Sequence, residues 1–184
     1  MQDLQTKILE AAVRVFMRYG VGRTRMGDIA AEAGIVRQTI YSFFKNKDEV
    51  LCAAIQHYSD QSLAKIHKDW ERSSDLGDKL DAFFEHAILS SFAIVSATPD
   101  ARDMIGGFNA AGKAATERAQ SDKIGAWKKT LADHSNSSIT NISTDRLAEC
   151  IVLSSLGLRD RAEDVEQLRD LLEIQKLGIV SMLK

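Results

Sequence analysis

The sequence predicts an all-α protein, and three observations support this fold class. Hydrophobic side chains recur with a period near 3.6 residues in almost every segment of the 184-residue chain. The chain contains one proline, Pro99, so proline interrupts few of these segments. Glycines and short polar stretches separate the periodic segments, as helix ends and loops require. The expected helices, nine in number, cover about residues 4–19, 25–33, 37–44, 46–70, 78–96, 99–105, 109–134, 144–159 and 163–183.

Specific residues define the ends of these helices. Gly20 and Gly34 are expected C-terminal stops, because glycine accepts the left-handed conformation that closes many helices. Thr24 is the expected N-cap of the second helix. Thr98 and Pro99 read as a cap followed by proline in the first helical position, which marks a helix start. Acidic residues 48–49 open the long fourth helix near the positive end of its dipole.

Composition places the chain among ordinary globular proteins, with 45% hydrophobic and 27% charged residues. We find no apolar run close to the ~18 residues of a membrane helix and no signal-peptide core at the N-terminus. We therefore expect a cytoplasmic protein without a membrane partner. Cys52 and Cys150 lie far apart in helical segments, so reduced, buried thiols are expected rather than a disulfide.

Charge is unevenly distributed along the chain, although the net charge is only −2. Residues 1–47 contain eight basic and four acidic side chains, a net charge of +4. The other 16 basic and 22 acidic side chains give residues 48–184 a net charge of −6. A basic head on an acidic body is typical of a polyanion-binding module joined to a separate domain.

Residues 26–51 contain a helix-turn-helix pattern within the basic head. Two short apolar-periodic segments flank Gly34, which supplies the bend between them. Ile29, Ala30 and Ala33 are expected to pack against Ile40 and the first helix. The second helix of such a motif enters the DNA major groove with its N-terminal residues foremost.

The polar residues of this motif suit DNA chemically. Arg37 can pair bidentately with guanine, Gln38 can pair with adenine, and Thr39 can contact a thymine methyl group. Tyr41 and Ser42 carry hydroxyls suited to phosphate. The predicted DNA-binding residues are Thr24, Arg25, Arg37, Gln38, Thr39, Tyr41, Ser42, Lys45 and Lys47. The alternative for the recognition residues is a solvated helix face, and Arg14, Arg18 and Arg23 read more simply as surface charge.

The run T-x-x-x-D-I-A-x-x-A-G-I-x-x-x-T-I-Y-x-x-F-x-N-K-D-E-V-L, over residues 24–51, resembles the DNA-binding signature of the TetR family of bacterial repressors. This resemblance implies a three-helix DNA-binding domain over residues 1–47 and a larger helical domain over 48–184. The larger domain would bind a small-molecule effector and dimerise, so that the homodimer reads a palindromic double-stranded DNA operator. The chain departs from the family pattern at Val36, which cannot cap the recognition helix, and at Gln38 and Phe43.

Two further residue sets are expected in the larger domain. Aromatic and other apolar side chains with two histidines could line an effector pocket, although most such residues also suit a core. This set is His57, Phe84, His86, Phe92, Met104, Phe108 and Trp127. The last two helices carry more apolar positions than one narrow stripe needs, so we expect burial on more than one side. The resemblance to the TetR family implies a dimer interface there, and the alternative is an ordinary core within the chain. That set is Ile151, Leu153, Leu158, Leu168, Leu171, Leu172 and Ile179.

Two other classes of function stay open at this point. A helical enzyme or small-molecule carrier would use the N-terminal motif structurally, and a docking module would use it to bind a protein. The sequence contains no G-x-S-x-G, glycine-rich phosphate loop, H-E-x-x-H or metal-ligand spacing, so we expect neither an enzyme nor a bound metal or cofactor. The basic head disfavours the protein-docking alternative.

Overall fold

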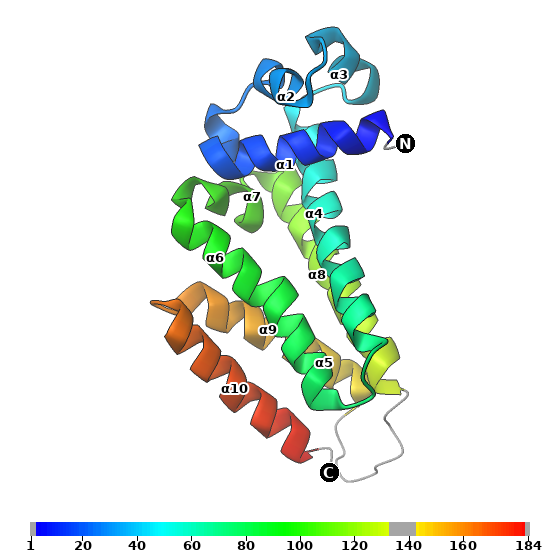
Figure 1. The fold of residues 1–184 in the computed structure, drawn as a ribbon, viewed down its shortest axis with the longest axis vertical. Coiled ribbons are helices and arrows are strands. Elements are labelled where there is room, and N and C mark those ends of the chain that lie inside the picture. Colours follow the sequence, from blue (N-terminus) through cyan, green and yellow to red (C-terminus); the bar gives the residue numbers. More distant parts are fainter. Residues whose placement is uncertain (1–2, 133–142, 183–184) are drawn as a thin grey trace. The chain divides into compact units, whose positions relative to one another are not determined.

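The structure is a computed structural model that describes residues 3–132 and 143–182, and within these ranges it contains helices and no β-strand (Figure 1). The all-α prediction is therefore confirmed. The helical elements are α1 (Leu4–Arg23), α2 (Met26–Ala33), α3 (Arg37–Phe43), α4 (Lys47–Trp70), α5 (Leu76–Phe83), η1 (Phe84–Leu89), α6 (Ser90–Ala97), η2 (Pro99–Ala101), α7 (Arg102–Gly106), α8 (Ala110–Ala132), α9 (Thr144–Arg161) and α10 (Val165–Met182). The polar loop that the sequence places between α8 and α9 lies mostly outside the described residues.

The chain folds into two compact units. The first comprises Met1–Gln61 and Ile94–Ala119, and the second comprises Ser62–Ala93 and Gln120–Lys184. The expected boundary after residue 47 marks the end of the helix-turn-helix motif. The division into a DNA-binding and an effector-binding domain at this residue stays a prediction. The two compact units are defined by packing and not by function.

The first unit has a core in which α1, α2 and α3 meet. Ile8 and Phe16 of α1 are fully buried there. Ile29 of α2 and Ile40 of α3 are also fully buried in the same core, which confirms the packing predicted for the motif. The apolar stripe of α1 thus positions both helices of the motif.

Gly34 joins α2 to α3 in the left-handed conformation that the sequence predicts, with φ 65° and ψ 38°. Its N–H donates to the Ala31 carbonyl at 3.1 Å, and the Ile35 N–H donates to the Ala30 carbonyl at 3.0 Å. These two bonds form a Schellman motif, which satisfies carbonyls that α2 would otherwise leave open. The sharp bend sets the direction of α3 relative to α2.

Two predicted helix ends differ from the structure. Gly20 has non-helical angles, with φ 75° and ψ 157°, yet α1 resumes and ends at Arg23. The cap predicted at Thr24 is wrong, because the N-cap of α2 is Arg25. The Thr24 hydroxyl donates instead to the Gly20 carbonyl at 2.7 Å, and the Asp28 carboxylate accepts a hydrogen bond from the Arg25 N–H at 2.7 Å.

The second unit has a core rich in aromatic rings. Trp127 packs edge-on against Trp70 and Phe83, with centroid distances of 4.7 and 5.7 Å. Leu168 and Leu172 of α10 are buried in the same core. These contacts hold the C-terminal helix against α5 and η1.

The helical stretch Leu76–Ala97 is the most apolar part of this fold. It begins two residues before the predicted start at Asp78, because the Asp75 carboxylate caps it by accepting the Asp78 N–H at 3.1 Å. Its 22 residues include a window of mean hydropathy 1.3, so length and composition alone would suit a membrane span, contrary to the sequence expectation. Phe83 and Ile88 are nevertheless buried in the core of the second unit, as in the core helix of a folded domain.

Candidate nucleic-acid interface and effector cavity

Recognition helix α3 is fixed to the head by two apolar side chains. Ile40 is fully buried, and Phe44, which directly follows α3, is 5% exposed. Val36 stands at the N-cap and makes no side-chain cap, as its chemistry predicts, and it is 70% exposed. A helix of seven residues is marginal alone, so burial of these anchors supplies most of its stability.

Most of the predicted DNA-binding residues share the exposed surface of this motif. Thr39 is half-buried. The exposed members are Arg25, Arg37, Gln38, Tyr41, Ser42 and Lys45. The structure therefore places six of the nine predicted side chains in contact with solvent, on the motif whose second helix would enter a groove.

Arg37 and Tyr41 interact directly on α3. The Arg37 Nη2 donates to the Tyr41 hydroxyl at 3.0 Å, and the guanidinium carbon lies 5.5 Å from the ring centroid. Ser42 donates its hydroxyl to the Thr39 carbonyl at 2.6 Å, so its proton is engaged within the helix. The exposed row is thus partly pre-ordered by its own contacts.

Lys47 and Thr24 also have structural roles in the head. The half-buried Lys47 ammonium donates to the Val21 carbonyl at 2.8 Å and to the Thr24 carbonyl at 3.1 Å. An ammonium group carries three protons, and these bonds use two of them. Thr24 itself is buried, so the structure does not expose it for the predicted DNA contact.

The arginines of α1 form ion pairs within the first unit. Arg14 Nε donates to Glu32 at 2.7 Å, and this contact lowers the pKa of the Glu32 carboxyl. Arg18 lies 3.8 Å from the same carboxylate. Arg23 pairs with Asp100 of η2. These partners reduce the charge available to a polyanion, which leaves Arg25, Arg37 and Lys45 as the exposed cations of the motif.

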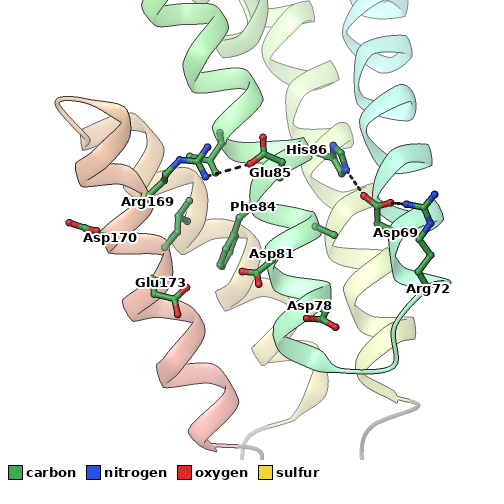
Figure 2. A pocket seen from close by; sticks show the side chains of 13 residues that line it. Asp69, Arg72, Asp78, Asp81, Phe84, Glu85, His86, Arg169, Asp170 and Glu173 are labelled. Carbon is green, nitrogen blue, oxygen red and sulfur yellow. Dashed lines mark hydrogen bonds and ion pairs between the residues drawn. The ribbon is translucent and has the colours of Figure 1, made fainter.

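The second unit contains a cavity of about 730 Å³ lined by α4, α5, η1 and α10. Figure 2 shows Arg169, Asp170 and Glu173 of α10 on one side of Phe84, and His86 and Asp69 on the other. Besides these residues the lining contains Arg72, Asp78, Asp81, Ala82, Glu85, Leu89 and Leu172. Six carboxylates face two guanidinium groups and one imidazole, so the cavity carries an excess of negative charge.

A π-helical turn shapes this cavity. Within η1 the Ser90 N–H donates to the Glu85 carbonyl, five residues earlier in the chain. The hydroxyls of Ser62 and Ser90 donate to the His86 carbonyl at 2.9 and 2.7 Å. Turns of this kind occur frequently at functional sites, because they redirect side chains that a regular helix would place elsewhere.

His86 and Asp69 connect η1 to α4 at the cavity wall. His86 Nε2 lies 2.7 Å from an Asp69 carboxylate oxygen, and Arg72 donates to the other oxygen at 2.9 Å. The hydrogen bond with His86 is the main cause of the lowered pKa of the Asp69 carboxyl. The carboxylate is therefore ionised at neutral pH and accepts from both neighbours.

Residues 8–54 match the family described as "Bacterial regulatory proteins, tetR family". Residues 8–54 therefore form a DNA-binding domain of the TetR family. The transcriptional regulator TtgR of Pseudomonas putida is 39% identical over 80 residues, which are 44% of this chain and 36% of that protein. The chain thus aligns with only about a third of the length of this curated relative.

Solved structures are similar to the chain over nearly its whole length. A Rhodococcus protein described as a TetR-family transcriptional regulator superposes with a TM-score of 0.76, 17% identity and complete coverage of both chains. The Bacillus subtilis regulator FadR, solved in complex with stearoyl-CoA, superposes with a TM-score of 0.68 and 18% identity. That likeness covers 96% of this chain and 97% of FadR. At sequence identities of 17% and 18%, this structural similarity shows that the fold is shared and nothing more.

Only two of the seven residues predicted for an effector pocket, Phe84 and His86, line the cavity of the second unit. Trp127 is fully buried in the core of the second unit, and Phe92 packs against that core. The remaining three, His57, Met104 and Phe108, belong to the first unit. Six acidic and two arginine residues of the lining were not predicted, because they come from segments that only the folded chain brings together.

The seven residues predicted for a dimer interface also divide into groups. The buried ones, which fill the core of the chain itself, are Ile151, Leu168, Leu172 and Ile179. Leu158 and Leu171 are half-buried, and Leu153 is 53% exposed. Two residues outside the predicted set, Ile174 and Leu177 of α10, are 67% and 61% exposed. Exposed apolar side chains therefore exist on both α9 and α10, but most of them are not the predicted ones.

The two cysteines differ from the expectation of buried thiols. Cys52 is half-buried, and burial is the main cause that raises the pKa of its thiol. Cys150 is exposed on α9, so the prediction of burial is wrong there. Both thiols are free, and a raised pKa lowers the thiolate fraction that redox chemistry at Cys52 would need.

Proposed function

We propose that this chain is a ligand-responsive transcriptional regulator, acting as a repressor, that binds a palindromic DNA operator as a homodimer in the cytoplasm. The exposed polar row of α3, held in place by Ile40 and Phe44, is the observation that carries the proposal. The names of the relatives that share this domain support it. The net charge of +4 on residues 1–47 would provide the sequence-independent part of the affinity.

The proposed dimer interface is the exposed apolar face of α9 and α10. Leu153, Ile174 and Leu177 would lose their exposed surface against the same residues of a second copy, because a two-fold interface is self-complementary. Leu158 and Leu171 would lie at the edge of this contact. Two recognition helices would then read two half-sites, which gives specificity that one short helix cannot reach.

The proposed effector site is the cavity that contains Phe84 and His86. Buried apolar side chains form part of its lining, and its excess of carboxylates favours a cationic effector over an anionic one of similar size. Effector binding would regulate DNA affinity only if the effector prefers one of two conformations of the dimer. The stearoyl-CoA complex of FadR shows that a protein with this fold can bind a small molecule.

A selection from a random duplex pool tests the proposal. Full-length protein at near-physiological salt should enrich a palindrome, whose half-site spacing would give the distance between recognition helices. A variant with Arg37→Ala and Gln38→Ala should not enrich the same sequence, whereas Lys65→Ala, an exposed change outside the head, should do so. If wild-type protein with native circular dichroism enriches no sequence, with or without candidate cationic ligands, the proposal is wrong.

A further inference from the structure

Arg37 and Tyr41 form a pre-ordered pair on the exposed face of α3. Their spacing of four residues places them one turn apart on the same side of the helix. The hydrogen bond of 3.0 Å and the position of the guanidinium at 5.5 Å from the ring centroid hold the arginine head against the tyrosine. Both side chains are exposed, Tyr41 to 43%, so the pair is held by its own contacts and not by burial in the core.

The pair leaves most of the arginine head available for recognition. A guanidinium carries five N–H donors in a fixed fork, and the Tyr41 hydroxyl accepts from Nη2 alone. A free arginine side chain would lose rotamer entropy on binding a base edge, whereas a head already held by a neighbour loses less. Guanine offers the two acceptors, O6 and N7, that match such a fork in the major groove.

We propose that Tyr41 is a positioning residue that presents Arg37 to a guanine in each half-site. The inference rests on the proposed function, and it gives the Tyr41 hydroxyl a role in base preference in place of the phosphate contact expected from the sequence. A phosphate contact fixes the position of the protein on any sequence, because phosphates are the same at every base pair. A positioning role makes the loss of the hydroxyl depend on the base that Arg37 faces.

The experiment uses full-length protein and the duplex enriched by wild-type protein from the random pool. Dissociation constants are measured at one salt concentration for this duplex and for every single base-pair substitution within a half-site. The proteins are wild type, R37A, Y41F and the double variant. Y19F is the matched control, because Tyr19 is an exposed tyrosine of α1 that also stacks with an arginine, Arg18, at 5.7 Å.

Wild type should discriminate against substitution of one G·C pair by a factor of about 5 to 150, the range of a good bidentate contact. R37A should abolish the discrimination at that pair, and Y41F should reduce it at least threefold without changing preferences elsewhere. The double variant should bind no more weakly than R37A, because the hydroxyl acts through the arginine. Y19F should retain the wild-type profile.

Two outcomes would overturn the inference and leave the proposed function standing. In one, Y41F weakens binding by the same factor on every duplex and adds fully to the effect of R37A, which would make Tyr41 a phosphate contact only. In the other, the enriched palindrome contains no G·C pair whose recognition depends on Arg37. A pool that yields no palindrome would contradict the proposed function itself. Because both side chains are exposed, circular dichroism spectra of the variants should match wild type.

Discussion

The replacement Lys47→Met is expected to destabilise the head by about 2 kcal/mol in the absence of DNA. Methionine keeps much of the unbranched stem but removes the ammonium that donates to the Val21 and Thr24 carbonyls at 2.8 and 3.1 Å. Hydrogen bonds to charged groups contribute about 1.5–3 kcal/mol each. Lys47 is half-buried, so water replaces part of each bond, and about 1 kcal/mol is lost for each.

The assay must report on the first unit. Trp70 and Trp127, the two tryptophans of the chain, both belong to the second unit, so their fluorescence would not follow the head. Amide hydrogen exchange of α1 and α2 gives a direct measure, because protection there reflects the opening free energy of these helices. A loss of about 2 kcal/mol corresponds to roughly 30-fold faster exchange.

Lys45→Met provides the control for this prediction. It removes the same charge two residues earlier, from an exposed side chain, and should change protection by less than about 0.5 kcal/mol. Unchanged exchange in Lys47→Met, or an equal acceleration in both variants, would refute the structural role of the Lys47 ammonium.

Three other replacements test separate parts of the structure. Gly34→Ala should destabilise the head by about 1–2 kcal/mol, because alanine is strained at a φ of +65°. The added Cβ would cause no clash, since its nearest atom, a lysine Nζ, lies 3.9 Å away. Hydrogen exchange of the head should show the loss of stability. Leu177→Asp should convert the dimer to a monomer in sedimentation velocity without changing the circular dichroism, and a persistent dimer would place the interface elsewhere. His86 lowers the pKa of Asp69, so the stabilisation is present above the unfolded pKa of about 3.9 and disappears as pH falls through the folded pKa. Urea unfolding followed by tryptophan fluorescence should therefore show that the difference between wild type and Asp69→Asn shrinks on acidification; a difference independent of pH would contradict this.

The head could be predicted in detail because its determinants are local in sequence. Gly34, the apolar anchors and the polar row all lie within one stretch of residues 26–44, where helical periodicity fixes which face each occupies. Errors occurred where two residues competed for one role. Thr24 is a good cap by residue type, yet its hydroxyl donates instead to the carbonyl of Gly20, where the helical angles of α1 are broken.

The cavity could not be predicted for the opposite reason. Asp69, Glu85 and Arg169 are separated by long stretches of chain, and no periodicity in the sequence relates a residue of α4 to one of α10. Aromatic side chains were the available signal for a pocket, but the same property places Trp127 in the core. The π-helical turn likewise has no signature in the 3.6-residue periodicity of the sequence, and it determines where His86 lies.

Residues 1–47 also depend on packing partners that lie far away in the sequence. We therefore expect them to bind DNA only as part of a larger folding unit. The core of the first unit also contains Val50, Leu51 and Ala54 of α4, Met104 of α7 and Ala115 of α8, each at most 4% exposed. Burial of the valine, leucine and methionine contributes about 1.5–3 kcal/mol each, or about 5–9 kcal/mol together, which is comparable to the whole stability of a small domain. A fragment of residues 1–47 should therefore show no cooperative thermal transition by circular dichroism, whereas the full chain should unfold cooperatively. A sharp transition in the fragment would mean that the helix-turn-helix head is stable without these partners, and that the packing of α7 and α8 against it serves another purpose.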